Sequence, residues 1–179
     1  DGQTGLIDTT FTIRFDPEVR FLIFGKGPEA CTFAALVQSA RHSNLLLSPD
    51  KETLEIGAGV GCDTRQLLRP EFPADLMVDP WTAIVLFFHD HDWEPQILQG
   101  ALGGPAFYIG AQGSQRARDA RLQELEAMGV VRIDLDRLHG PIGLIPSARD
   151  AGTLSVSVLA EVLACRMQLS NQRELASDC

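Results

Sequence analysis

A short apolar run, a glycine-rich turn and an amphipathic helix follow one another near the start of this sequence. The run Arg20–Phe24 (RFLIF) is rich in β-forming residues, and the glycine turn begins directly after it. Apolar residues then recur at helical spacing, at Ala30, Phe33, Ala34 and Val37. Gly25, Gly27 and Ala30 occupy the three positions of a G-x-G-x-x-A dinucleotide-binding turn. The stretch therefore predicts a strand that leads through a tight turn into a helix.

The same alternation continues to the end of the chain. Ala83–Phe88 (AIVLFF) is uninterrupted and apolar, as expected for a strand buried on both faces of a parallel sheet. Further strands are predicted at Thr10–Arg14, Asn44–Leu47, Arg65–Leu68 and Ala106–Ile109. Helices are predicted at Glu52–Ala58, Gln96–Leu102, Gln115–Met128 and Leu154–Met167, the last capped by Thr153. The pattern predicts an α/β fold, a Rossmann-like three-layer sandwich with a mostly parallel sheet.

Length and composition indicate one soluble globular domain over residues 1–179, with 1–19 as a lead-in segment containing a strand and 168–179 as a polar tail. The net charge of −9 argues against nucleic acid as the main partner, because phosphate neutralisation needs clustered Lys and Arg. The longest apolar runs fall far short of the ~20 residues of a membrane span. The four scattered cysteines suggest no disulfide framework, so we expect a reducing cytoplasm.

The stretch Thr53–Leu68 (TLEIGAGVGCDTRQLL) is similar to the first motif of S-adenosylmethionine-dependent methyltransferases. In those enzymes the motif lies on the first strand, whereas here two predicted strands and a helix precede it. Ser48 and Pro49 also signal a helix start just upstream, with Ser48 as cap. We therefore predict that Thr53–Gly61 is a short helix ending in a glycine turn, away from any ligand, and rank a methyltransferase as the less favoured alternative.

Two glycine turns are candidate anion sites. Gly25 and Gly27 open the first predicted helix, and backbone N–H groups at a helix start attract phosphate. The segment Gly110–Ser114 (GAQGS) is a second such turn, in which Ser114 can cap the following helix and Arg116 can reach a phosphate. Ligands of open α/β sheets gather at the carboxyl edge of the strands. We predict a phosphate-bearing ligand held by Gly25, Gly27, Gly110, Gly113, Ser114 and Arg116.

Polar residues follow two of the predicted strands. Asp50 lies twenty residues past Ala30, a spacing acceptable for a ribose contact. His89-Asp90-His91-Asp92 has metal-ligand chemistry, but no third or fourth ligand at close spacing accompanies it. We therefore predict no metal, with His89 and Asp90 hydrogen bonding at the mouth of the ligand crevice. The sequence contains no motif of an activated nucleophile, which favours a binding role.

Three segments together resemble the C-terminal domain of the XdhC/CoxI family, the xanthine dehydrogenase accessory factors. They are TAIVLFFHDHD, AFYIGAQGSQRARDARLQELEAMG and HGPIGLIPSARDAGTLSVSVLAEVLA, and the resemblance covers roughly Phe21–Ala164. It implies a Rossmann-like domain that binds molybdenum cofactor and serves as a chaperone for a molybdenum hydroxylase client, together with a cofactor-sulfurating enzyme. The family's N-terminal module is expected to be absent from this chain.

The chain departs from the family at the first turn, which reads Gly25-Lys26-Gly27-Pro28 where the family usually has G-A-G-H. An NAD(P)-dependent oxidoreductase is the alternative function, although no acid or base beside a nicotinamide and no substrate lid is identifiable.

The final helix and the Thr10–Arg14 strand each have an apolar face that should be buried against another surface. We therefore also predict a homodimer.

Overall fold

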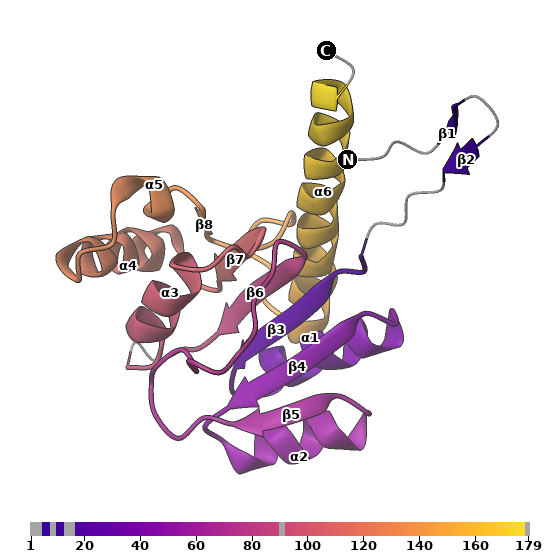
Figure 1. The fold of residues 1–179 in the computed structure, drawn as a ribbon. Helices are drawn as coiled ribbons and strands as arrows, with labels where there is room; N and C mark the ends of the chain where they lie inside the picture. Colours follow the sequence, from indigo (N-terminus) through magenta and orange to yellow (C-terminus); the bar gives the residue numbers. More distant parts are fainter. Residues whose placement is uncertain (1–4, 8–9, 13–16, 90–91, 178–179) are drawn as a thin grey trace.

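A six-stranded parallel sheet forms the centre of the computed structural model, which describes residues 5–7, 10–12, 17–89 and 92–177 (Figure 1). Its strands are β3 (Arg20–Gly25), β4 (Ser43–Ser48), β5 (Asp63–Gln66), β6 (Thr82–Phe87), β7 (Tyr108–Ala111) and β8 (Leu138–His139). They lie in the order β5-β4-β3-β6-β7-β8, and every neighbouring pair is parallel. This is the strand order of dinucleotide-binding doubly wound folds. The predicted Rossmann-like fold and its four parallel strands are confirmed.

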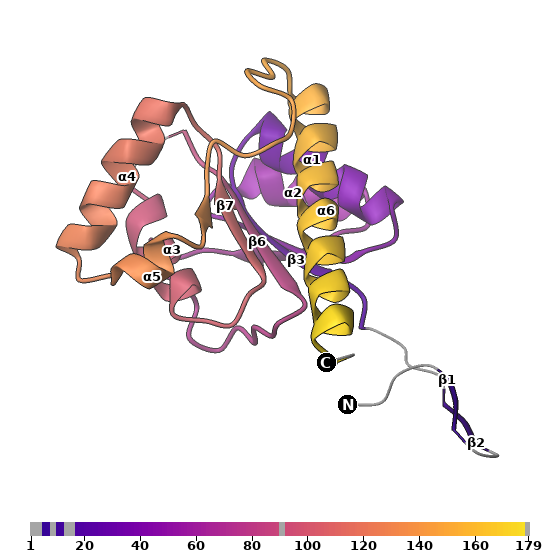
Figure 2. The ribbon, with the colours of Figure 1, turned by 90° about the horizontal axis from the view of Figure 1, so that it is seen from above.

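Helices cover both faces of the sheet, and the three layers are visible from above (Figure 2). The helices are α1 (Pro28–Ser39), α2 (Lys51–Gly59), α3 (Glu94–Leu102), α4 (Gln115–Ala127), α5 (Arg132–Leu135) and α6 (Ala151–Ser177). Helices α1, α2 and α6 lie on one face, and α3, α4 and α5 lie on the other. Alternate residues of one strand therefore enter different cores: Phe21 and Ile23 of β3 pack under α1, whereas Leu22 and Phe24 pack under α3.

The lead-in segment forms a separate two-stranded antiparallel hairpin, β1 (Gly5–Ile7) and β2 (Thr10–Thr12). It projects away from the main sheet (Figure 1). The predicted strand Thr10–Arg14 is thus confirmed for its first three residues, and the last two lie outside the described residues. The predicted edge strand Arg65–Leu68 is shifted by two residues to β5.

The methyltransferase-like stretch is helical, as predicted. Residues 53–59 belong to α2, so Thr53–Ile56 is not the strand that the first motif of a methyltransferase requires, and the resemblance of this stretch to that motif does not extend to its structure. Two predicted caps are wrong. Asp50, not Ser48, caps α2 by accepting a hydrogen bond from the Thr53 N–H, and Asp150, not Thr153, accepts from Thr153 N–H at the start of α6. Each aspartate immediately precedes the first residue of its helix, which is the position from which a side chain can reach the N–H groups of the first turn.

Helix α6 is longer than predicted and continues ten residues past Met167, to Ser177. By length and composition its segment Ala151–Asn171 meets the criteria for a membrane span. One side of this segment packs on α1 and on the sheet through Leu154, Val158 and Val162. Burial of that side is the behaviour of a core helix, in which an apolar stripe faces the protein interior.

Candidate functional site

Both glycine turns lie at the carboxyl edge of the sheet, where the strands end and the helices begin. The first joins β3 to α1 and the second joins β7 to α4, with β6 between the two strands. Neighbouring strands lie about 4.8 Å apart, so the two turns are separated by about 10 Å across the edge. The predicted arrangement of the two turns on one edge is confirmed.

The first turn, Gly25–Ala30, is closed by contacts within the protein. The Lys26 N–H donates to the Phe87 carbonyl at 3.2 Å, and the Gly27 N–H donates to Thr53 Oγ1 at 3.0 Å. Thr53 Oγ1 in turn donates to Asp50 Oδ2 at 2.6 Å. These bonds tie the start of α1 to the start of α2.

The second turn, Gln112–Gln115, opens onto a cleft. Ser114 caps α4 and accepts from the Ala117 N–H at 3.2 Å, as the sequence predicted. Gly113 has a φ of +147°, and Gly113, Ser114, Gln115 and Arg116 are all exposed. The first turn of α4 contains no acidic residue. The helix start therefore presents its positive end to the cleft, and the Asp119 carboxylate one turn farther along accepts from the Gln115 side chain at 2.9 Å.

The cleft has a volume of about 750 Å³ and lies between this turn and the loop that leads into α6. Pro141, Ile142 and Gly143 form one part of its lining, and Ile145–Arg149 with Leu154 of α6 form another. Arg149 is exposed and supplies a basic side chain at the lining. The cleft brings together two of the sequence segments that carry the family resemblance, the glycine–serine turn and the Pro-Ile-Gly loop.

A buried ion pair holds the second turn in place. Arg121 of α4 and Glu94 of α3 are 5% and 2% exposed, and Arg121 Nη2 lies 2.9 Å from Glu94 Oε2. The same nitrogen donates to the Gln112 carbonyl at 2.9 Å. The sequence analysis did not single out Arg121, which lies in a helix rich in polar residues. Its partner is 27 residues away, so no local pattern signals the pair.

The opposite wall of the cleft is anchored to α6 by a cluster of polar residues. Glu161 accepts hydrogen bonds from the Tyr108 hydroxyl at 2.8 Å and from the Gly143 N–H. Ser157 Oγ accepts from the Ile145 N–H at 2.7 Å. A Cβ on Gly143 would lie 2.6 Å from Ser157 Oγ, so only glycine allows this approach. These contacts fix the loop that forms the cleft wall.

His139 belongs to the same cluster. Its ring stacks on Tyr108 with centroids 4.4 Å apart, and its Nδ1 lies 3.7 Å from Glu161 Oε1. Burial lowers the pKa of His139, and the nearby Glu161 carboxylate opposes that shift in part. Burial, followed by the same carboxylate, raises the pKa of Tyr108 far above its ordinary value, so the phenol stays protonated and donates.

The other predicted site residues are dispersed. Gly110 lies inside β7, not in the turn, and a Cβ there would meet Ile142 and Tyr108 at 2.7 Å. Asp50 is the α2 cap, held by Thr53. His89 Nε2 lies 3.3 Å from Glu29 Oε2 in the first turn of α1. Asp90 lies outside the described residues. Within the described ranges no group of three or more potential metal ligands occurs.

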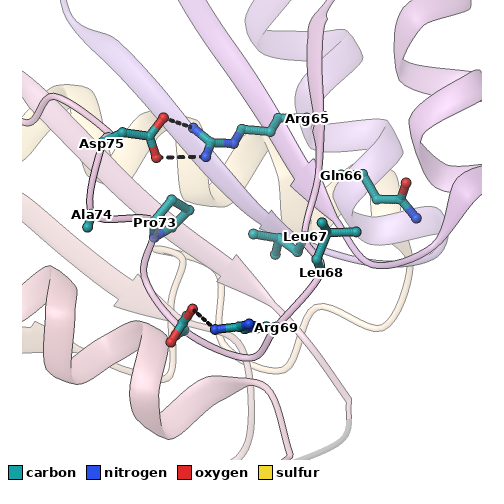
Figure 3. Close-up of a pocket in the computed structure, with 9 residues that line it drawn as sticks. Arg65, Gln66, Leu67, Leu68, Arg69, Pro73, Ala74 and Asp75 are labelled. Atoms are coloured by element: carbon teal, nitrogen blue, oxygen red, sulfur yellow. Dashed lines mark hydrogen bonds and ion pairs between the residues drawn. The ribbon is translucent and has the colours of Figure 1, made fainter.

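A second cavity, of about 350 Å³, lies in the loop that follows β5 (Figure 3). The Arg65 guanidinium and the Asp75 carboxylate face each other across it and form two hydrogen bonds, of 3.0 and 2.7 Å (Figure 3). Both side chains are exposed, so this pair contributes little stability. The lining contains no aromatic ring, and Arg65 is already engaged by Asp75. We therefore place the candidate ligand site at the cleft beside Ser114.

The parallel sheet with two helix starts at its carboxyl edge defines a Rossmann-like binding domain. The model of the XdhC Rossmann domain matches residues 21–162, and the chain belongs to the XdhC family. It is 33% identical over 165 residues to the molybdenum cofactor insertion chaperone PaoD of Escherichia coli (strain K12), covering 92% of this chain. The chain spans 46% of that relative's length, about half.

A solved structure of a xanthine dehydrogenase from Bacillus halodurans has the same fold. It superimposes with a TM-score of 0.72 at 19% sequence identity. The match covers 85% of this chain and 44% of the Bacillus chain. At that identity the likeness supports the Rossmann-like architecture and carries no argument about activity.

Proposed function

We propose that this chain is the cofactor-binding Rossmann domain of a molybdenum-cofactor chaperone that supports maturation of a xanthine dehydrogenase-type molybdenum hydroxylase. The observation that carries the proposal is the 33% identity, over 92% of this chain, to a protein named as a molybdenum cofactor insertion chaperone. Membership of the XdhC family agrees with it. The absence of an activated-nucleophile motif in the sequence agrees with a binding role.

The cleft beside the second glycine turn is the proposed cofactor site. Molybdopterin carries a phosphate, and the N-terminal amides of α4 offer donors with a partial positive charge. Gly113 and Ser114 shape that helix start, and Arg116 and Arg149 are exposed cations beside it. In this proposal these four residues hold the phosphate, and the Ile142–Ile145 side of the cleft contacts the ring system. The chemistry that the bound cofactor supplies is that of its molybdenum centre, which serves the client enzyme.

A charge placed at the helix start tests the site. Ser114→Asp should lower the affinity for molybdenum cofactor at least tenfold, since two like charges about 4 Å apart repel by ~4 kcal/mol at a protein surface. Ser114→Asn is the matched control, because Ser, Asn and Asp cap helices about equally well. Bound molybdenum per protein is measured after gel filtration of the loaded chain. Equal affinity in the two variants would place the phosphate elsewhere, whereas no binding by the unchanged protein would refute the function itself.

The proposal extends to partners and compartment. A cofactor chaperone needs a recipient, and we propose a molybdenum hydroxylase as client, with a cofactor-sulfurating enzyme as second partner and the cytoplasm as the location. Family resemblance supports the two partners, and the scattered cysteines support a reducing cytoplasm. A homodimer remains a prediction from the apolar surface of α6, which exposes Val156 and Met167. Light scattering at micromolar concentration decides it, since a monomer mass would contradict the prediction.

A further inference from the structure

The Gly25–Ala30 turn has the spacing of a dinucleotide fingerprint, yet three of its successive backbone donors are engaged or missing. In such folds the pyrophosphate binds backbone N–H groups of the turn and the helix start. Here the Lys26 N–H donates to the Phe87 carbonyl and the Gly27 N–H donates to Thr53 Oγ1. Pro28 is the next residue and has no N–H. Lys26, Gly27 and Pro28 therefore have no free backbone N–H to offer a phosphate.

Two carboxylates lie beside the turn, together with the positive charge of Lys26, which acts on Asp50. Asp50 Oδ2 accepts from both the hydroxyl and the N–H of Thr53, at 2.6 and 2.8 Å. The Thr53 hydroxyl therefore bridges the Asp50 carboxylate and the Gly27 N–H. These hydrogen bonds hold the pKa of Asp50 below its ordinary value, and Asp50 is ionised at neutral pH. Glu29 places a second carboxylate in the first turn of α1. A pyrophosphate at this helix start would face both carboxylates.

The two glycines of the pattern are required by the fold itself. A Cβ on Gly25 would lie 2.6 Å from the Phe87 carbonyl oxygen, so glycine allows β3 to end against β6. Gly27 has a φ of +83°, a conformation that favours glycine. A ligand is therefore not needed to account for either residue.

We infer that the N-terminus of α1 has an internal occupant, the Thr53 hydroxyl backed by the Asp50 carboxylate, and that nicotinamide dinucleotides do not bind at this turn. The Thr53–Asp50 pair takes the place of a phosphate and joins α1 to α2. The inference concerns a different turn from the proposed cofactor site and does not depend on the chaperone function. It disagrees with what the dinucleotide-like spacing alone suggests.

The first experiment is a titration of the unchanged protein with NADH and NADPH, followed by the backbone amide resonances of Gly25–Ala30. We expect no saturable shift of the Gly27 and Ala30 amides up to millimolar nucleotide. Saturable binding with shifts confined to these amides would overturn the inference. Shifts at Gly113–Arg116 alone would agree with it, because that turn belongs to the other site.

The second experiment tests the occupant directly. Thr53→Val removes the hydroxyl at nearly constant volume, and hydrogen exchange of the Gly27 amide should then accelerate about tenfold, the loss of one hydrogen bond. Thr64→Val is the control, because Thr64 is exposed on β5 and has no part in the network. Exchange of the Leu22 amide in β3 verifies that the variant is folded. An unchanged Gly27 rate in folded Thr53→Val would show that Thr53 does not occupy the helix start.

Discussion

The two glycine turns at the carboxyl edge have similar sequences but opposite surroundings. The first has three engaged or missing donors and two nearby carboxylates, Asp50 and Glu29. The second has a serine cap, no acid in its first helical turn, and an open cleft in front of it. The spacing of the glycines indicates only that the backbone can form a tight turn. The residues that face the turn determine whether a ligand can bind there. The predictions below test this contrast in order of decreasing effect.

The largest effect is expected from the buried pair that supports the second turn. Arg121→Met should lower the free energy of unfolding by about 3–5 kcal/mol, because it removes the guanidinium that compensates the buried Glu94 carboxylate. Urea denaturation measures the change. The double variant Glu94→Leu with Arg121→Met should recover most of the loss, since an apolar pair carries no desolvation penalty. A single-variant loss below ~1 kcal/mol would mean that the pair is not the support described here.

The next effect belongs to the first turn. Gly25→Ala should cost about 1–3 kcal/mol, because the added Cβ meets the Phe87 carbonyl oxygen at 2.6 Å and the strands must separate. Gly27→Ala adds a Cβ into open space and should cost only the ~1 kcal/mol of its positive φ. Thermal unfolding of the two variants gives the comparison. A greater loss in Gly27→Ala would contradict the packing role assigned to Gly25.

A smaller effect is expected at the cap of α2. Asp50→Ala should destabilise the fold by about 1 kcal/mol through loss of the helix cap. Asp50→Asn keeps an acceptor for the Thr53 N–H and should remain within a few tenths of a kcal/mol of the unchanged protein. Urea midpoints at neutral pH measure both. If the asparagine variant lost as much as the alanine variant, the charge of Asp50 would matter more than its hydrogen bond.

The smallest effect concerns pH and the wall of the cleft. The pKa of His139 is lowered from its ordinary value of 6.5 because burial favours the neutral ring. The unfolded chain therefore binds a proton more readily, so the contribution of His139 to stability is complete above pH 6.5 and is lost as pH falls through the folded-state pKa. The facing groups are Glu161 and Tyr108, with Cys165 near Glu161.

His139→Gln provides the measurement for this last effect. Tyr108 does not titrate in the acid range, and Glu161 is retained in the variant. The difference between the two melting-temperature profiles from pH 7.5 to 5 therefore isolates His139. The unchanged protein should lose more stability on acidification than the variant. Parallel profiles would show that His139 is as solvated in the fold as in the unfolded chain.

Much of the fold was predictable from local pattern. Apolar runs such as Ala83–Phe88 are long enough to mark buried strands, and the following turns mark where each strand ends. Ser114 was predictable as a cap because capping depends on residues within one turn. The predicted helix over the methyltransferase-like stretch was confirmed for the same reason, although Asp50, and not Ser48, is its cap.

The candidate site was only partly predictable, because its decisive contacts join distant segments. Thr53 reaches Gly27 across 26 residues, and Glu161 reaches Gly143 across 18. The helix and strand periodicities of the sequence give no indication of contacts between residues this far apart. Gly110 was assigned to the turn because the sequence gives no sign that β7 continues through it. Asp50 was singled out from the sequence, but only the fold shows that its carboxylate accepts from the Thr53 N–H.

Helix α6 connects the wall of the cleft with the opposite edge of the sheet. Near its start Ser157 and Glu161 hold the cleft wall, and farther along the Arg166 guanidinium lies 3.6 Å above the Trp81 ring, just before β6 begins. A helix rises 1.5 Å per residue, so Ser157 and Arg166 are about 14 Å apart on one stiff rod. The same helix therefore holds the cleft wall near its start and contacts Trp81 beside the amino edge of the sheet farther along, so a shift of α6 along its axis would be felt at both places.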